Sequence, residues 1–300
     1  MIGIDWGTSA FRAYRFDPTG ALAERRESMQ GILAVPAGGF PAALRQAVGD
    51  WLAAGEREVL LCGMVGSRQG WQEAPYLPCP AGPGEIAAAL MPLPFEGARC
   101  RLVPGLIARD AAGVPDVMRG EETKLVGLLD LVGEGAAQAC LPGTHSKWAR
   151  IGGGRILGFA THMTGEVRAV LLAHSILGRL AGPDAESDLA YLRGVARAAE
   201  PGGLLHHLFG TRALGLAGDL AAAETGAYLS GLLIGHELSA AQAEAAAGPV
   251  HLAGAPTLTR LYALALRARG LPCRIHAEDL AARGLTLLQR IADGRGTPPP

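Results

Sequence analysis

The feature that most constrains the fold is a glycine-hydroxyl turn that occurs twice between extended segments. Residues 2–9 read Ile-Gly-Ile-Asp-Trp-Gly-Thr-Ser, and residues 139–146 read Ala-Cys-Leu-Pro-Gly-Thr-His-Ser. In each copy a short apolar run precedes Gly-Thr, and a strand-like segment follows, over 11–16 and 147–151. A glycine-bearing turn then leads into a further candidate strand, which is typical of a β-hairpin. Two hairpins of one design predict a chain built from two related halves.

The tips of the two hairpins are suited to holding phosphate. Glycine lets backbone N–H groups approach phosphate oxygens closely, and Thr or Ser hydroxyls donate further hydrogen bonds. A carboxylate cannot bind phosphate, so we expect Asp5 to hold Mg²⁺ through water. Two ordinary hairpins are the alternative, because Gly-Thr is a common dipeptide. The residues expected to hold phosphate are Gly7, Thr8 and Ser9 in the first copy and Gly143, Thr144, His145, Ser146 and Lys147 in the second.

Composition excludes several classes of protein. The 300 residues correspond to one large or two ordinary domains, and 49% hydrophobic residues can fill their cores. A formal net charge of -1 argues against a dedicated nucleic-acid binder, which needs a basic excess. The sequence shows neither an uncharged apolar span of about 20 residues nor a signal-peptide pattern. Five scattered cysteines without a Cys-x-x-Cys pair predict a globular protein of the reducing cytoplasm.

Apolar periodicity predicts an α/β chain in two halves, with the boundary between Pro115 and Ala137. The expected strands are at 2–4, 10–16, 21–26, 59–62, 99–103, from 137 onward, and at 250–254. The expected helices are at 40–52, 84–91, 120–131, 164–180 with Thr164 as N-cap, 187–199, 225–247 and 256–269.

A glycine-rich loop at 63–76 is the first candidate substrate site. It follows the strand at 59–62 and so lies at the carboxyl edge of a sheet, where α/β proteins bind ligands. Arg68 can bind a carboxylate through two hydrogen bonds, Gln69 can recognise hydroxyls, and Trp71 can pack against a sugar face. A surface loop with a Trp in a domain contact is the alternative.

Three carboxylates surround Arg119 where a helix is expected to begin. Asp116 is expected on the preceding loop, and Glu121 and Glu122 in the first helical turn. Such a carboxylate can act as general base toward a hydroxyl or bind metal-held water. Acidic residues also favour helix N-termini through the dipole, so a structural role is the alternative. The sequence leaves the choice between Asp116 and Glu121 open.

The second hairpin and a late strand-turn complete the set of motifs. A serine hydrolase is an alternative for the second hairpin, but neighbouring strand side chains point to opposite faces, which disfavours a pair of His145 and Ser146. Residues 250–256 predict a strand, a small-residue turn and a helix start. Gly254 and Ala255 there leave room for a flat ring.

The order of these motifs resembles the actin-like ATPase superfamily, which includes sugar kinases. In that resemblance residues 5–8 and 142–146 are the two phosphate loops, and residues 252–256 are the adenosine motif. The resemblance covers the full chain. It implies two actin-like, ribonuclease H-like α/β domains, 1–118 and 119–300, with ATP and substrate in an interdomain cleft. It also implies that the last helix can pack on the first domain.

Within the superfamily the chain is most similar to the 2-dehydro-3-deoxygalactonokinase family. The segments that carry this resemblance are 5–8, 62–71, 116–122, 141–148 and 161–166. It implies transfer of the ATP γ-phosphoryl group to the 6-hydroxyl of 2-dehydro-3-deoxy-D-galactonate with Mg²⁺. We expect Asp5 and either Asp116 or Glu121 to be catalytic. The expected substrate contacts are Trp6, Arg12, Ser67, Arg68, Gln69, Trp71 and Arg119.

Other functions stay open at this point. Exopolyphosphatases of the same superfamily use Glu in a step similar to Gly120-Glu121-Glu122. A phosphohydrolase of that type, a kinase for another sugar acid and a regulatory ATP-binding module are the alternatives. The expected partner is a small sugar acid and not nucleic acid or membrane, and a homodimer is left open.

Overall fold

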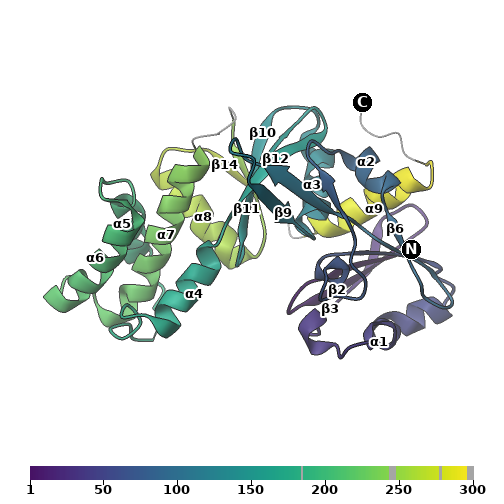
Figure 1. Cartoon of the computed structure of the whole chain (residues 1–300), viewed down its shortest axis with the longest axis horizontal. Coiled ribbons are helices and arrows are strands. Elements are labelled where there is room, and N and C mark those ends of the chain that lie inside the picture. Colours follow the sequence, from purple (N-terminus) through teal and green to yellow (C-terminus); the bar gives the residue numbers. More distant parts are fainter. Residues whose placement is uncertain (184, 243–247, 277–278, 296–300) are drawn as a thin grey trace. The chain divides into compact units, whose positions relative to one another are not determined.

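The computed structural model describes residues 1–183, 185–242, 248–276 and 279–295 (Figure 1). The chain forms two compact units. Unit 1 comprises 1–136, 151–159 and the described residues from 279 onward, and unit 2 comprises the rest of the described chain. This division differs from the boundary expected at residue 118, because residues 119–136 belong with unit 1.

Unit 1 is built on a six-stranded mixed sheet with the order β3-β2-β1-β4-β7-β6. β1 pairs antiparallel with β2 and parallel with β4, so Asp5 lies beside Arg12 on one side and Cys62 on the other. The carboxyl ends of β1 and β4 therefore meet at one edge. The strands are β1 (Ile2–Trp6), β2 (Phe11–Phe16), β3 (Leu22–Ser28), β4 (Glu58–Cys62), β6 (Met91–Leu93) and β7 (Arg99–Leu102).

The two faces of this sheet carry different helices. Ile2, Ile4 and Trp6 share a core cluster with residues of α1 (Phe40–Ala53). On the other face Gly3 approaches α9 (Leu280–Ala292), where an added Cβ would lie 3.0 Å from Leu285 Cδ1. Alternation along β1 thus divides its side chains between two helical layers.

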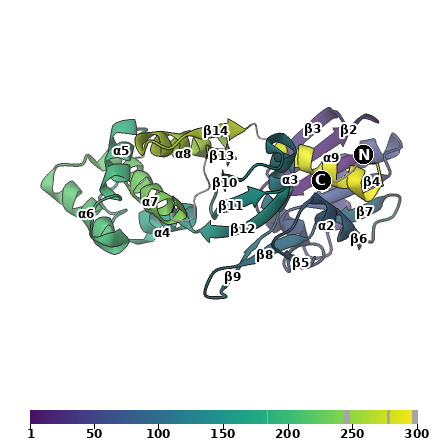
Figure 2. The same cartoon turned by 90° about the horizontal axis from the view of Figure 1, so that it is seen from above.

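α9 packs closely on α3 (Glu121–Val132), and the two helices lie side by side in both views (Figures 1 and 2). A Cβ on Gly284 would lie 1.9 Å from Thr123 O, and one on Gly127 would lie 2.2 Å from Leu280 O. Glycine is needed at both positions because the backbones touch. This contact holds the start of α3 against α9 within unit 1.

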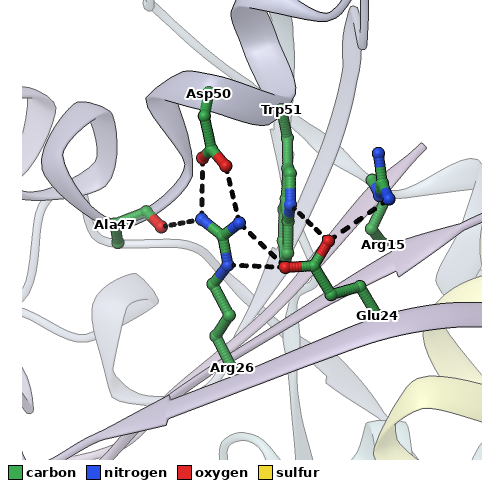
Figure 3. Close-up of polar contacts among 6 residues, drawn as sticks. All are labelled: Arg15, Glu24, Arg26, Ala47, Asp50 and Trp51. Atoms are coloured by element: carbon green, nitrogen blue, oxygen red, sulfur yellow. Dashed lines mark hydrogen bonds and ion pairs between the residues drawn. The ribbon is translucent and has the colours of Figure 1, made fainter.

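An ion-pair network ties α1 to β3 (Figure 3). Arg26 donates to both carboxylate oxygens of Asp50, at 2.7 Å each. Its guanidinium lies 4.0 Å from the centroid of the Trp51 ring, and Trp51 Nε1 donates to Glu24 at 3.0 Å. The buried ring of Trp51 thus fixes the position of α1 on the sheet.

A second, three-stranded sheet of order β5-β8-β9 was not predicted from the sequence. Asp116, expected on a loop, lies in β9 and pairs with Ala108. The helix expected at 84–91 ends at Ala88, and Met91 begins β6. The remaining elements of unit 1 are η1 (Ile32–Ala34), η2 (Met64–Gly66), β5 (Tyr76–Pro78), α2 (Pro83–Ala88), β8 (Gly105–Arg109) and β9 (Pro115–Met118).

A five-stranded sheet has the order β12-β11-β10-β13-β14, with β10, β13 and β14 parallel. Residues 151–159 of β11 and β12 are grouped with unit 1 and the rest of the sheet with unit 2. Its strands are β10 (Ala137–Leu141), β11 (Ser146–Gly152), β12 (Arg155–His162), β13 (Val250–Ala253) and β14 (Cys273–His276).

Helices make up the rest of unit 2, and α5, α6 and α7 lie together in Figure 1. They are α4 (Thr164–His174), α5 (Asp188–Arg197), α6 (Gly203–Ala217), η3 (Ala222–Glu224), α7 (Thr225–Gln242) and α8 (Pro256–Ala268). Both units thus have the α/β character predicted from the sequence.

Several expected elements are confirmed and others need correction. The helices at 40–52, 120–131 and 256–269 are confirmed by α1, α3 and α8. The helix expected to run to residue 180 ends at His174, and Met163, not Thr164, is its N-cap. α7 matches the helix expected from 225, while residues 243–247 lie outside the described residues.

Candidate active site

The carboxylate of Asp5 lies where β1 and β4 end. Its side chain is 11% exposed, and Arg12 Nη1 is 3.7 Å from its Oδ2. Burial raises the pKa of the Cys62 thiol well above its ordinary value, and the nearby carboxylates of Asp5 and Glu122 raise this pKa further. Asp5 and the start of α3 therefore flank the same thiol, on one side of the sheet.

Two glycines let three segments meet beside this carboxylate. Gly63 has φ +94°, and a Cβ there would lie 2.7 Å from Trp6 O and 3.3 Å from Asp5 Oδ1. Gly120 has φ +101°, and its Cβ would lie 3.0 Å from Gly63 Cα. L-residues rarely adopt this backbone conformation, and neither position has room for a side chain. The ends of β1 and β4 and the start of α3 thus converge through backbone contact.

The first turn of α3 is capped by its own carboxylates. Glu122 is fully buried and accepts hydrogen bonds from Gly120 N at 2.6 Å and Thr123 Oγ1 at 3.0 Å. Burial raises the pKa of Glu122 to about 7, and the neighbouring Glu121 carboxylate adds to the effect. Glu121 accepts a hydrogen bond from Arg119 N at 3.1 Å. Glu122 therefore supplies the cap that Gly120 lacks.

Sequence reasoning did not assign a role to Glu122, although a signal was present. Glu122 shares the buried face of α3 with Leu125, Val126 and Leu129. These positions follow the i, i+3, i+4, i+7 spacing of one helix face, so the pattern predicts a buried carboxylate.

The aromatic rings expected as substrate contacts lie at or near the core. Trp6 is 1% exposed, its ring packs edge-on against Phe11, and its Nε1 donates to Gln30 O at 2.9 Å. Trp71 is partly buried, and its ring stacks on Phe40 with centroids 6.2 Å apart. A direct contact between Trp6 and a substrate would require its ring to leave the core.

Arg68 in the loop at 63–76 and Arg119 beside this loop differ in exposure. Arg68 is 87% exposed and forms an ion pair with Glu73 at 3.6 Å. Arg119 is 7% exposed, donates from Nη2 to Ala74 O at 2.7 Å, and lies 4.3 Å from the centroid of the Tyr76 ring. Arg119 thus anchors the loop, and Arg68 extends from it.

Further polar groups of the loop also differ in exposure. Gln69 is exposed. Within the described residues, Ser67 Oγ and the Nε and Nη1 atoms of Arg119 are buried and lack a hydrogen-bond partner. Groups of this kind usually have a protein, water or ligand partner. The loop therefore carries unused hydrogen-bonding capacity next to Arg119.

The first tip, residues 7–10, is a compact turn with an exposed end. Gly7 N donates to Ala10 O at 2.9 Å, and Leu33 N donates to Thr8 O at 3.3 Å. The side chains of Thr8 and Ser9 are exposed. The tip therefore presents its hydroxyls to solvent while the segment after β3 supports its backbone.

The second tip, residues 142–145, is exposed at Thr144 and His145, while the strand that follows is buried. Ser146 is 0% exposed, and its Oγ lies 2.8 Å from Tyr262 Oη. Lys147 is 5% exposed, and its Nζ donates to Thr161 Oγ1 at 2.6 Å. These two side chains, expected from the sequence to hold phosphate, make buried contacts within unit 2.

Two other segments adjoin the second tip. A Cβ on Gly254 would lie 3.3 Å from Pro142 O, so the turn after β13 lies beside the tip. Ala255 next to it is exposed. Gly165 and Glu166 at the start of α4 contact Gly143 and Thr144, a contact that sequence reasoning missed. The residues assigned to phosphate and to adenosine in unit 2 therefore share one surface.

The donor set beside β1 fits Mg²⁺. In the part of the chain that the structure describes, no group of three or more His, Cys, Asp or Glu side chains could hold a metal ion. Mg²⁺ does not require such a cage, since it keeps several waters and binds through one or two carboxylates and substrate phosphates. Asp5 is a carboxylate of this type.

Comparison with known proteins identifies the family. A family model described as 2-keto-3-deoxy-galactonokinase matches residues 5–288. The chain belongs to this family. It is a kinase for 2-keto-3-deoxygalactonate, an activity of galactonate catabolism, and a kinase of this kind uses ATP. The function expected from the sequence is confirmed at this level.

Individual members of the 2-keto-3-deoxy-galactonokinase family match the chain over nearly its whole length. It is 38% identical over 293 residues to the probable 2-dehydro-3-deoxygalactonokinase DgoK1 of Rhizobium meliloti (strain 1021), a match that covers 96% of this chain and 95% of that protein. It is 34% identical to the 2-dehydro-3-deoxygalactonokinase of Escherichia coli (strain K12), covering 93% and 94%.

Solved structures confirm the fold. A Sinorhizobium meliloti protein to which the same activity is ascribed has a TM-score of 0.89 at 38% identity, covering 96% of this chain and 98% of that one. The activator of the 2-hydroxyisocaproyl-CoA dehydratase from Clostridium difficile with bound ADPNP has a TM-score of 0.55 at 10% identity, covering 98% and 96%. The chain has the mixed α/β fold of actin-like ATPases. None of its described helices combines the length and apolarity needed to cross a bilayer.

Proposed function

We propose that this kinase transfers the γ-phosphoryl group of ATP to the 6-hydroxyl of 2-dehydro-3-deoxy-D-galactonate with Mg²⁺. The observation that carries the proposal is the convergence beside Asp5 of β1, the loop that begins at Gly63 and the carboxylates of α3. In this proposal Asp5 binds the metal, the loop recognises the acid, and a carboxylate near the start of α3 acts as the base.

The two tips hold the phosphates of ATP in this proposal. Backbone N–H groups of both tips donate to phosphate oxygens, and the exposed hydroxyls of Thr8 and Thr144 add further bonds. Ser146 and Lys147 support the second tip from within, since their side chains contact other residues of unit 2. The turn at Gly254 receives the adenosine end. When bound, Mg²⁺ supplies charge neutralisation at the phosphates.

The candidate bases are Asp116 and Glu121, and both stay proposals. Asp116 lies on β9, and Glu121 lies at the first position of α3 with one oxygen on Arg119 N. Phosphoryl transfer passes through a loose transition state, so positioning and neutralisation matter more than the strength of the base. We therefore expect Asp5→Asn to lower kcat at least as much as the substitution of either carboxylate.

The loop at 63–76 recognises the carboxylate of the sugar acid. Arg68 is the proposed partner of that carboxylate, because its guanidinium is exposed. Its ion pair with Glu73 is long, at 3.6 Å, so the substrate carboxylate can replace Glu73 as its partner. Arg119 holds the loop from below, and Arg12 lies beside Asp5. Gln69, Ser67 and Trp71 complete this surface.

A coupled ADP-release assay with a panel of sugar acids tests the proposal. We expect turnover with 2-keto-3-deoxy acids and no phosphate release without an acceptor. Arg68→Ala should raise KM for the acid roughly tenfold or more with little change in KM for ATP, as loss of a charged hydrogen bond does. Arg109→Ala, at another exposed arginine of unit 1, is the control. Phosphate release without acceptor would favour the exopolyphosphatase alternative, and equal effects of Arg68→Ala on both KM values would remove its role.

We further propose a cytoplasmic location. All five cysteines are free thiols, and three of them are buried, which suits a reducing compartment. The homodimer left open by the sequence is tested by the molar mass from light scattering.

A further inference from the structure

The start of α4 is built directly against the second tip. Glu166 N donates to Thr144 O at 3.1 Å. A Cβ on Gly165 would lie 2.6 Å from Gly143 O and 2.8 Å from Thr144 Cα, closer than real Cβ atoms come to other atoms. Only glycine fits at this position, so the backbone contact fixes where the next residue, Glu166, stands relative to the tip.

The side chain of Glu166 reaches the imidazole of His145 on that tip. Glu166 Oε2 contacts His145 Nε2, and the two side chains are 43% and 48% exposed. A carboxylate accepts hydrogen bonds and donates none, so the contact requires the proton on Nε2. The ring is thereby held through Nε2, and Nδ1 is the ring nitrogen left for an anion.

We propose that Glu166 is a positioning residue for ATP, which holds the His145 imidazole ready for the phosphates. The inference rests on the proposed function, since it requires the second tip to bind phosphate. A carboxylate beside a polyphosphate is repelled by it unless a cation lies between them. The His145 imidazole can lie between them: Nε2 donates to Glu166, and a ring that carries its second proton donates from Nδ1 to a phosphate oxygen.

A role in folding alone does not account for this pair. Ion pairs between half-exposed side chains contribute little to stability, with a typical value of about 0–1 kcal/mol. The fold can therefore survive removal of either partner, and effects on nucleotide binding can be measured in folded variants.

The proposal predicts the sign of the coupling between the two side chains. Glu166→Gln should weaken binding of the nucleotide about threefold. The amide oxygen of Gln is a weaker acceptor than a carboxylate, so the ring of His145 is held less firmly. His145→Ala should weaken it by about tenfold, since it removes a phosphate contact and also leaves an unpaired carboxylate beside the phosphates. In the double variant H145A/E166Q the repelling charge is absent, so binding should be tighter than in His145→Ala.

Calorimetric titration with AMPPNP and Mg²⁺, without sugar acid, measures these Kd values directly. Glu200→Gln, at an exposed carboxylate of unit 2, is the control and should bind like the unsubstituted protein. Kinetic measurements should show the same changes in KM for ATP while KM for the acid stays constant.

The outcomes separate a failure of the proposed phosphate site from a failure of the role of Glu166. If His145→Ala leaves the Kd for AMPPNP unchanged, the second tip does not hold phosphate through His145, and that part of the proposed function fails. If His145→Ala weakens binding but Glu166→Gln has no effect, or the double variant binds no tighter than His145→Ala, Glu166 has no positioning role and the proposed function stands without it.

Discussion

Replacing Glu122 by Gln should change how the stability of the protein depends on pH. Glu122 is fully buried, and burial raises its pKa from the ordinary 4.5 to about 7. Below pH 4.5 the carboxyl is protonated in both the folded and the unfolded chain, and its ionisation has no effect on stability. As pH rises from 4.5 to 7 the unfolded chain loses this proton while the folded chain keeps it, so the free energy of unfolding falls.

The size of the effect follows from the shift. A difference of one pKa unit corresponds to about 1.4 kcal/mol, so the buried Glu122 costs about 3 kcal/mol above pH 7. The amide introduced by Glu122→Gln has no proton to lose, and its oxygen can still accept from the N–H of Gly120. The stability of Glu122→Gln relative to the unsubstituted protein should therefore improve by about 2.5 kcal/mol between about pH 5 and about pH 8, since part of the effect already occurs below pH 5.

Urea unfolding followed by tryptophan fluorescence, in steps from about pH 5 to about pH 8, measures this difference. Glu134→Gln is the control, because Glu134 is an exposed carboxylate of unit 1 that lies beyond the end of α3, away from Glu122. The stability difference between this control and the unsubstituted protein should stay constant with pH. A pH-independent difference for Glu122→Gln would refute the reasoning, since it would mean that Glu122 is ionised in the folded protein over the whole range.

Two further substitutions test the packing inside each unit, one in unit 1 and one in unit 2. Gly63→Ala should destabilise unit 1 by about 1–3 kcal/mol, through strain at φ +94° and the close contact with Trp6 O. It should also lower kcat, because it displaces the loop that begins at Gly63. Urea unfolding measures the first effect and the coupled assay the second, and unchanged values would contradict the convergence beside Asp5. Tyr262→Phe should cost about 1–3 kcal/mol in urea unfolding, because it removes the hydroxyl that bonds to Ser146 and Glu237; a neutral result would mean that these buried groups find other partners.

The turns of the site could be predicted from the sequence, but the burial of individual side chains in it could not. The hairpin at Asp5 and the strand-turn at Gly254 follow from apolar runs interrupted by glycine, which are properties of short segments. The sequence did not show that Ser146 and Lys147 are both buried. Their strand is covered on both faces, and Tyr262 of α8, which bonds to Ser146, is more than a hundred residues away in the chain.

Burial by residues distant in the chain also explains why the sequence did not show that Trp6 and Arg119 are enclosed. Each lies in a motif and carries a side chain suited to sugar acids, so residue type alone favoured a substrate contact. The partners that enclose them, Phe40 for Trp6 and Tyr76 for Arg119, come from other elements of unit 1. Tertiary packing decided which members of each motif reach the surface.

The central claim is that the 6-hydroxyl of the sugar acid receives the γ-phosphoryl group. Proton-coupled phosphorus NMR of the product formed from ATP and 2-dehydro-3-deoxy-D-galactonate tests it most directly. The account predicts a single phosphomonoester coupled to the two protons at carbon 6, with one ADP formed for each ester. A phosphoryl group on another oxygen, or release of inorganic phosphate in place of the ester, would contradict it.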